Sequence, residues 1–259
     1  MKETTVDSLR VSIYDTRQQM GEAAAAQAAD QIRQLLTTKE EVNIIFAAAP
    51  SQNEFLEALL HEKIDWQKVN AFHMDEYLGL EKGASQHFGY WLKEMIFGKL
   101  PFKEVFYLDG QTDRPEEECA RYRALLEQHP IDLVAMGIGE NTHLAFNDPH
   151  VADFSDPYLV KVVDLDDACK QQQVNDGCFG RPEEVPTYAF TLTIPALLSA
   201  TYVYCMVPGR NKATAVRHTL TDAISELYPS TILRKHPNAL LFLDKDSAAQ
   251  IVTAEADVQ

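Results

Sequence analysis

Short apolar runs alternate with longer amphipathic segments along this chain. In the runs "VNIIFAAA" and "IDLVAMGI" consecutive positions are apolar, so both faces of each strand would be buried, as in the interior of a parallel sheet. The predicted strands are Val42–Ala49, Val69–Met74, Val105–Leu108, Ile131–Ile138, Tyr158–Val163, Tyr188–Ile194, Thr201–Val207 and Ala239–Leu243.

The segments between these runs have helical patterns. Ser51 with Glu54 three residues later predicts a capping box. Pro115 followed by glutamates is typical of a helix N-terminus. The predicted helices span Thr16–Leu36, Ser51–Leu60, Pro115–Gln128 and Gly209–Leu220. The alternation predicts the α/β class: a Rossmann-like, doubly wound, mostly parallel sheet with helices on both faces, forming a single domain over residues 1–259.

In such a sheet the ligand lies beyond the carboxyl ends of the strands, so the loops that follow them are candidate sites. Asp75, in "FHMDEYLGL", comes directly after the predicted strand ending at Met74 and is placed to act as a general base. The alternative is an acidic residue that only caps the next segment.

The stretch "MGIGENTHLAFNDP" is a second candidate loop. Gly137 and Gly139 permit close approach of the backbone to a ligand, and their amides are expected to hold a sugar oxygen. His143 can move protons near neutral pH, and either Asn141 or Asp148 can reach its imidazole and fix the tautomer. A histidine satisfied by loop backbone is the alternative.

Two strand-to-helix turns, "FAAAPSQNEF" and "MVPGRNKATA", are candidate anion sites, because helix N-termini bind anions. Ala48, Ala49 and Ser51 lie in the first, where Ser51 either caps the helix or contacts a ligand. Lys212, in the second, is unfavourable in a first helical turn, and a bound phosphate would remove that conflict. A solvated surface lysine is the alternative.

Charge and composition exclude some classes of function. The formal net charge of −16 argues against nucleic acid and anionic membranes as partners. The start, "MKETTVDSLR", has no apolar signal region and no run approaches a membrane span, so a cytoplasmic protein is expected. The four cysteines form no C-x-x-C pair, which predicts reduced thiols and no metal site.

The motifs "FHMDEYLGL", "GIGENTHLAFNDP" and "PGRNKA" together resemble those of the glucosamine-6-phosphate deaminase/isomerase family, whose wider superfamily includes 6-phosphogluconolactonase. The resemblance runs from about Val11 to Leu243. It implies a cofactor-free aldose–ketose isomerisation coupled to loss of ammonia. It also implies roles for four residues: Asp75 as the base between C1 and C2, His143 in ring opening, Asp148 as its partner and Lys212 on phosphate.

The chain departs from this family at the site. Asn141 replaces the usual aspartate, Asp148 replaces a glutamate, and "AAAPS" replaces a glycine-rich phosphate loop. The R-x-R-x-K pattern tied to allosteric control is missing after Asp148. An Asn carbonyl is expected to orient the ring N–H of His143. The phosphate-gripping arginine before "VPTYAFT" has no clear counterpart, and the nearby candidates are Lys170, Gln172, Gln173 and Arg181.

The resulting expectation is an enzyme that converts glucosamine 6-phosphate, or secondly galactosamine 6-phosphate, to a ketose 6-phosphate and ammonia. A small sugar phosphate is its expected partner, and a homo-oligomer is left open. One alternative is a lactone hydrolase, although the D-E-R and D-G-H motifs typical of the lactonases are absent. The other is a protein that binds sugar phosphates without turnover.

Overall fold

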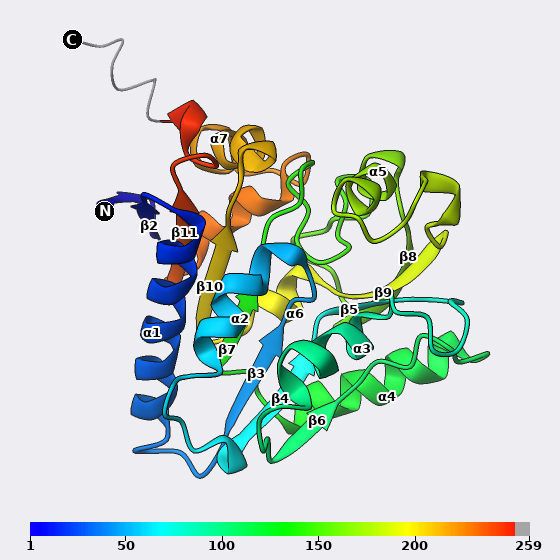
Figure 1. Cartoon of the computed structure of the whole chain (residues 1–259). Helices are drawn as coiled ribbons and strands as arrows, with labels where there is room; N and C mark the ends of the chain where they lie inside the picture. Colours follow the sequence, from blue (N-terminus) through cyan, green and yellow to red (C-terminus); the bar gives the residue numbers. More distant parts are fainter. Residues whose placement is uncertain (252–259) are drawn as a thin grey trace.

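The computed structural model describes residues 1–251 and contains a main sheet of 8 strands. Its spatial order is β1-β2-β11-β10-β7-β3-β4-β6, and every pair is parallel except β1 with β2 (Figure 1). In that order the strands are Lys2–Val6, Leu9–Tyr14, Ala239–Asp244, Tyr202–Val207, Leu133–Met136, Val42–Phe46, Val69–His73 and Glu104–Phe106.

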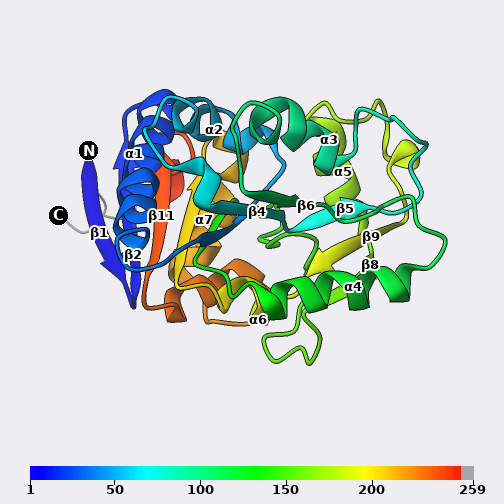
Figure 2. The ribbon, with the colours of Figure 1, turned by 90° about the horizontal axis from the view of Figure 1, so that it is seen from below.

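Helices cover both faces of this sheet. Figure 2 shows α1, α2 and α3 on one face and α4 and α6 on the other. The α-helices are α1 (Arg17–Leu35), α2 (Asn53–Leu59), α3 (Phe88–Leu92), α4 (Pro115–Gln128), α5 (Asp167–Asn175), α6 (Ile194–Leu198) and α7 (Ala213–Thr221). Short 3-10 turns are η1 (Pro50–Gln52), η2 (Trp66–Lys68), η4 (Pro182–Glu184), η5 (Arg210–Lys212) and η6 (Pro229–Lys235), and η3 (Lys93–Phe97) is a π-helix.

The side chains of the central strands feed two hydrophobic cores, one on each face of the sheet. Along β10, Tyr204 and Met206 belong to the core under α1, whereas Val203 and Cys205 belong to the core shared with α4 and α7. Successive side chains of a strand point to opposite faces, so a strand that is apolar at every position fits only between two covered faces. The predicted α/β, doubly wound architecture is confirmed.

The chain reverses its direction of travel across the sheet between β3 and β7. From β3 it proceeds through β4 to β6, and from β7 it proceeds the other way through β10 to β11. The carboxyl ends of β3 and β7 therefore form the topological switch point, where open α/β sheets bind their ligands.

Two of the predicted strands lie outside the main sheet. The runs near Tyr158–Val163 and Tyr188–Ile194 form β8 (Val160–Asp164) and β9 (Tyr188–Leu192), which pair antiparallel in a separate sheet of 3 strands with β5 (Asp75–Tyr77). An apolar run indicates that a strand is buried, but it does not indicate which strand it pairs with. The N-terminal hairpin of β1 and β2 was not predicted, because β1 is almost wholly exposed.

Two predicted helix starts are also wrong. Ser51 lies in η1, and α2 begins after Gln52 without a side-chain cap, so no capping box forms. Glu54 instead pairs with Arg17 of α1, with 2.6 Å between Oε1 and Nε. The helix expected from Gly209 opens with η5 and becomes α-helical at Ala213. Within residues 1–251 no helix is both long and apolar enough to cross a membrane.

Candidate active site

A cavity of about 160 Å³ lies at the switch point, beyond the carboxyl ends of β3, β4, β7 and β10. Most of the residues predicted from the sequence line it together. These are Ala48, Ala49, Ser51, Asp75, Gly137, Gly139, His143 and Lys212. Asn141 and Asp148 do not line it and instead contact His143 and its loop.

Asp75 was predicted to lie in a loop. It is instead the first residue of β5, where it pairs with Thr191 of β9. It lines the cavity yet is only 7% exposed. Burial, and secondarily the charge of Glu76, raises the pKa of Asp75 well above its usual range. A carboxylate with a raised pKa is a stronger base, which suits removal of a proton from carbon.

Glu76, the next residue, has a structural role. Its carboxylate accepts the backbone N–H groups of Phe88 at 3.1 Å and Gly89 at 2.9 Å, at the start of α3. Because successive side chains of a strand point to opposite faces, the two adjacent acids of β5 have separate roles: Asp75 lines the cavity and Glu76 holds the start of α3.

His73 fixes the backbone at Asp75, a role that sequence reasoning missed. The Leu108 N–H donates to Nε2 of His73 at 2.9 Å, so the ring proton is on Nδ1, which donates to the carbonyl of Asp75 at 2.8 Å. His73 is fully buried, and burial lowers its pKa. A histidine within the predicted strand Val69–Met74 was the available signal.

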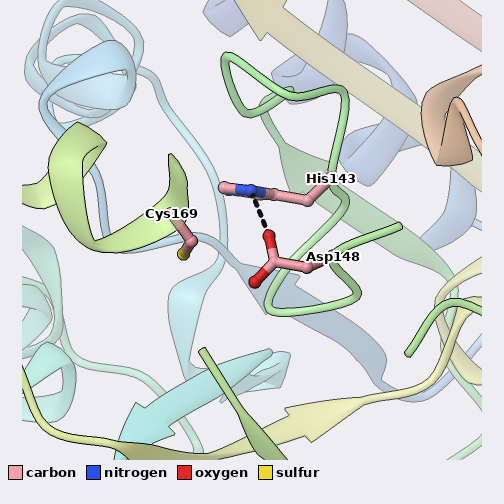
Figure 3. A group of neighbouring side chains, drawn as sticks. All are labelled: His143, Asp148 and Cys169. Atoms are coloured by element: carbon pink, nitrogen blue, oxygen red, sulfur yellow. Dashed lines mark ion pairs between the residues drawn. The ribbon is translucent and has the colours of Figure 1, made fainter. Parts of the chain in front are cut away.

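His143 is paired with Asp148. Nδ1 of His143 lies 2.9 Å from Oδ1 of Asp148, whose side chain is completely buried (Figure 3). Burial by itself raises the pKa of Asp148, but the contacts with His143 and Asn141 outweigh it and lower the pKa below its usual value. The carboxylate therefore stays ionised beside the imidazole and can support proton transfer by the ring.

The expectation that the Asn141 carbonyl orients the imidazole of His143 is wrong. Its Nδ2 donates to Oδ1 of Asp148 at 3.0 Å, and its Oδ1 accepts the backbone N–H of His143 at 3.2 Å. Asn141 therefore acts on the imidazole indirectly, through the carboxylate that faces it.

Gly137 and Gly139 both line the cavity, with side chains of the site packed against their backbone. The Gly139 N–H donates to the carbonyl of His143 at 2.9 Å, so the prediction that this amide holds a sugar oxygen is wrong. A Cβ at position 139 would lie 2.3 Å from the His143 ring, and one at 137 would lie 3.1 Å from Oγ of Ser51. Position 139 therefore needs glycine, whereas a Cβ at 137 would require Ser51 to shift only slightly.

The expected phosphate end of the cavity contains one buried cation. Lys212 is 5% exposed, and burial lowers its pKa. In the described part of the chain its ammonium has no ion pair within 4.0 Å. Ser51 lines the same cavity, and its Oγ accepts Nε2 of Gln52 at 3.0 Å. Ala49 is extended, with φ of −153°, so this loop does not use the left-handed backbone that glycines permit.

Arg17, at the start of α1, is a second cation of the cavity that sequence reasoning missed. Its guanidinium is held by Glu54 and by the carbonyl of Pro50. The omission has a clear cause: β2 was not predicted, so the turn after it was not recognised as another strand end at the ligand edge. Among the candidates for the missing arginine, Gln172 and Gln173 line the cavity, whereas Lys170 and Arg181 do not.

His143, Asp148 and Cys169 form the best candidate for a metal site, since their donor atoms all lie within 4.8 Å of one another (Figure 3). Tetrahedral zinc with ligand bonds of about 2.1 Å needs donor atoms about 3.4 Å apart. The separation of 2.9 Å between Nδ1 of His143 and Oδ1 of Asp148 is instead a direct imidazole–carboxylate contact. We therefore interpret these groups as an acid–base pair.

The chain is similar to known proteins over most of its length. The family model described as glucosamine-6-phosphate isomerases/6-phosphogluconolactonase matches residues 15–242. The glucosamine-6-phosphate deaminase of Listeria monocytogenes serotype 4a (strain HCC23) is 34% identical over 213 residues, covering 82% of this chain and 89% of the relative. That of Bacillus thuringiensis (strain Al Hakam) is 32% identical over 226 residues, covering 87% and 84%.

Solved structures agree. A monomeric glucosamine-6-phosphate deaminase superposes with a TM-score of 0.84 at 26% identity, over 92% of this chain and 98% of that chain. The 6-phosphogluconolactonase of Thermotoga maritima has a TM-score of 0.73 at 20% identity, over 93% of this chain and 100% of that chain, which shows a shared fold. The resemblance drawn from the motifs is confirmed: the chain belongs to the glucosamine-6-phosphate isomerase/6-phosphogluconolactonase family.

Proposed function

We propose that this protein is an amino-sugar-phosphate deaminase that converts glucosamine 6-phosphate, or secondly galactosamine 6-phosphate, to a ketose 6-phosphate and ammonia. One observation carries the proposal: a buried carboxylate, Asp75, and a histidine paired with a buried carboxylate, His143, line the same cavity as Lys212. The names of the curated relatives support the choice of substrate.

The chemistry divides between the two acid–base groups. His143, supported by Asp148, moves the proton from the C1 hydroxyl to the ring oxygen and so opens the sugar. Asp75 then removes the proton from C2 while O1 gains a proton, which gives a C1–C2 enolamine. Asp75 returns a proton to C1 as the C2 nitrogen loses one, so the product has a hydroxymethyl group at C1 and an imine at C2. Water adds to that imine, and the C2–N bond breaks to release ammonia and the ketose.

The cations bind the phosphate. With a formal net charge of −16, the chain repels a doubly charged anion at long range, so the cavity must supply local donors. Lys212 and Arg17 supply positive charge, and Ser51 supplies a hydroxyl. A phosphate would also give the buried Lys212 ammonium the counter-charge that it lacks within 4.0 Å in the described structure.

The test is a substrate panel. Purified protein is incubated with glucosamine 6-phosphate, galactosamine 6-phosphate and 6-phosphogluconolactone, and ammonia, ketose phosphate and acid are measured. We expect ammonia and ketose phosphate from at least one amino sugar. Lactone hydrolysis above the spontaneous rate, without ammonia, would replace the proposal by a lactonase. A thermal shift with a sugar phosphate but no product would replace it by a binding protein.

A further inference from the structure

The side chain of Asn141 lies between two carboxylates. Its Nδ2 is 3.0 Å from Oδ1 of Asp148 and 3.3 Å from Oδ2 of Asp166. Its Oδ1 accepts the backbone N–H of His143 at 3.2 Å, so both ends of the amide are engaged. An aspartate at position 141 would put a third carboxylate against the other two and would have no N–H to donate to them.

Asp166 ties this contact to α5. It is the N-cap of that helix, where its Oδ1 accepts the backbone N–H of Cys169 at 2.6 Å. The backbone N–H of Asp166 also faces Oδ2 of Asp148 at 3.5 Å. Asp148 and the start of α5 are therefore joined both directly and through Asn141.

Helix α5 in turn forms part of the cavity. It supplies Gln172 and Gln173 to the lining, and Oε1 of Gln172 accepts the backbone N–H of Glu140 at 2.7 Å. The loop that carries His143 and the helix that faces the ligand are thus linked at several points, one of which is the Asn141 amide.

We infer that Asn141 is a positioning residue whose neutral amide joins the carboxylates of Asp148 and Asp166 and thereby sets His143 relative to the α5 side of the cavity. The inference deepens the proposed function, and its kinetic test rests on that function. It requires positions 141 and 166 to be interdependent: an aspartate at 141 is tolerated when residue 166 supplies the amide, and is not tolerated beside Asp166.

The test exchanges the amide and the carboxylate between the two positions. Asn141→Asp adds like-charge contacts and is expected to lower kcat at least about tenfold, with a smaller change in KM. Asp166→Asn keeps a good N-cap and is expected to lower kcat less than about threefold. The double variant restores the natural net charge, and we expect it to recover at least about half of the loss on a logarithmic scale.

A matched control distinguishes the contact between residues 141 and 166 from the general effect of removing one negative charge nearby. Asp164→Asn removes the same charge from an exposed carboxylate that lies 3.2 Å from His150 and does not contact Asn141. Combined with Asn141→Asp it is expected to recover nothing. Should Asn141→Asp fail to fold, Asn141→Ala removes the amide without adding charge, and its loss of kcat should persist when Asp166→Asn is added.

A second readout does not need turnover. The imidazole ¹⁵N chemical shifts of His143, recorded without sugar phosphate, are expected to move in Asn141→Asp and to return toward the natural values only when Asp166→Asn is added. This arm decides the inference even if no amino sugar is deaminated. Equal effects of Asn141→Asp with and without Asp166→Asn, in both kcat and chemical shift, would overturn it.

Discussion

The imidazole of His143 packs directly on the α-carbon of Gly139, so closely that a Cβ built there lies 2.3 Å from the ring atoms. Gly139→Ala must therefore displace the imidazole or the loop. Since misplacement by about 1 Å can cost about 10²-fold in rate, we expect a loss of kcat of that order, measured by steady-state kinetics.

Gly180→Ala is the control for this prediction. Its added Cβ meets only the carboxylate of Glu184, at 3.1 Å, which is the tip of an exposed side chain paired with Arg181. We expect its activity to stay within about twofold of the natural protein. A Gly139→Ala protein with natural kcat would show that the position of the His143 ring is not important for turnover.

Asp75→Asn is predicted to trade activity for stability. Loss of the proposed base should reduce kcat by at least about 10²-fold. Because the folded-state pKa of Asp75 is raised, its ionisation costs more in the folded than in the unfolded chain. This cost appears as the pH rises above the unfolded pKa of about 3.9, so the amide should raise the free energy of unfolding at pH 7.

Urea denaturation at several pH values checks the sign. The stabilisation by Asp75→Asn should be present at neutral pH and shrink toward zero as the pH falls below the unfolded pKa of about 3.9, where Asp75 becomes protonated in both states. An Asp75→Asn protein that is less stable than the natural one at pH 7 would contradict the assignment of a buried carboxylate whose pKa is raised in the folded state.

Asp148→Asn should lower the free energy of unfolding at pH 7, in contrast to Asp75→Asn. The pKa of Asp148 is lowered in the folded protein, so its ionised form stabilises the fold above the unfolded pKa, and this contribution is lost as the pH falls through the lowered value. We expect a loss of about 2 kcal/mol at pH 7, since a buried charged hydrogen-bond partner is removed. Urea titration measures it, and an unchanged midpoint would argue against an ionised Asp148.

Lys212→Met tests the phosphate end. Removing the buried ammonium should raise KM for the sugar phosphate at least about tenfold and abolish the thermal shift produced by inorganic phosphate. Arg210→Gln, two residues earlier and exposed outside the cavity, is the matched control and should change neither. If Arg210→Gln raised KM as much as Lys212→Met, the anion would be bound through the general surface charge.

The sequence predicts the layers of helices and sheet in this fold better than it predicts which strands pair with one another. The consecutive apolar positions of β3, β7 and β10 require two covered faces, so the doubly wound architecture follows from burial alone. Nothing in the run Tyr188–Ile194 reveals that it pairs with Asp75–Tyr77 in a separate sheet, because strand partners are chosen by tertiary packing.

The site likewise contains some residues that could be predicted from the sequence and others that could not. Asp75, His143 and Lys212 follow recognisable strands, so their convergence on one cavity could be predicted. Arg17 follows β2, whose alternating apolar and polar residues are typical of a half-buried strand. This signal was overlooked beside the exposed β1, and Arg17 was missed with it. The contact between Asn141 and Asp166 joins residues 25 positions apart and could not be read from spacing.

The most direct test of the central claim compares ammonia and ketose phosphate released from glucosamine 6-phosphate, and from galactosamine 6-phosphate, by the natural protein and by Asp75→Asn. We predict that the natural protein releases the two products in equal amounts from at least one of these sugars, and that Asp75→Asn, folded by circular dichroism, releases neither at a comparable rate. Absence of ammonia from both sugars, or undiminished release by Asp75→Asn, would contradict the account.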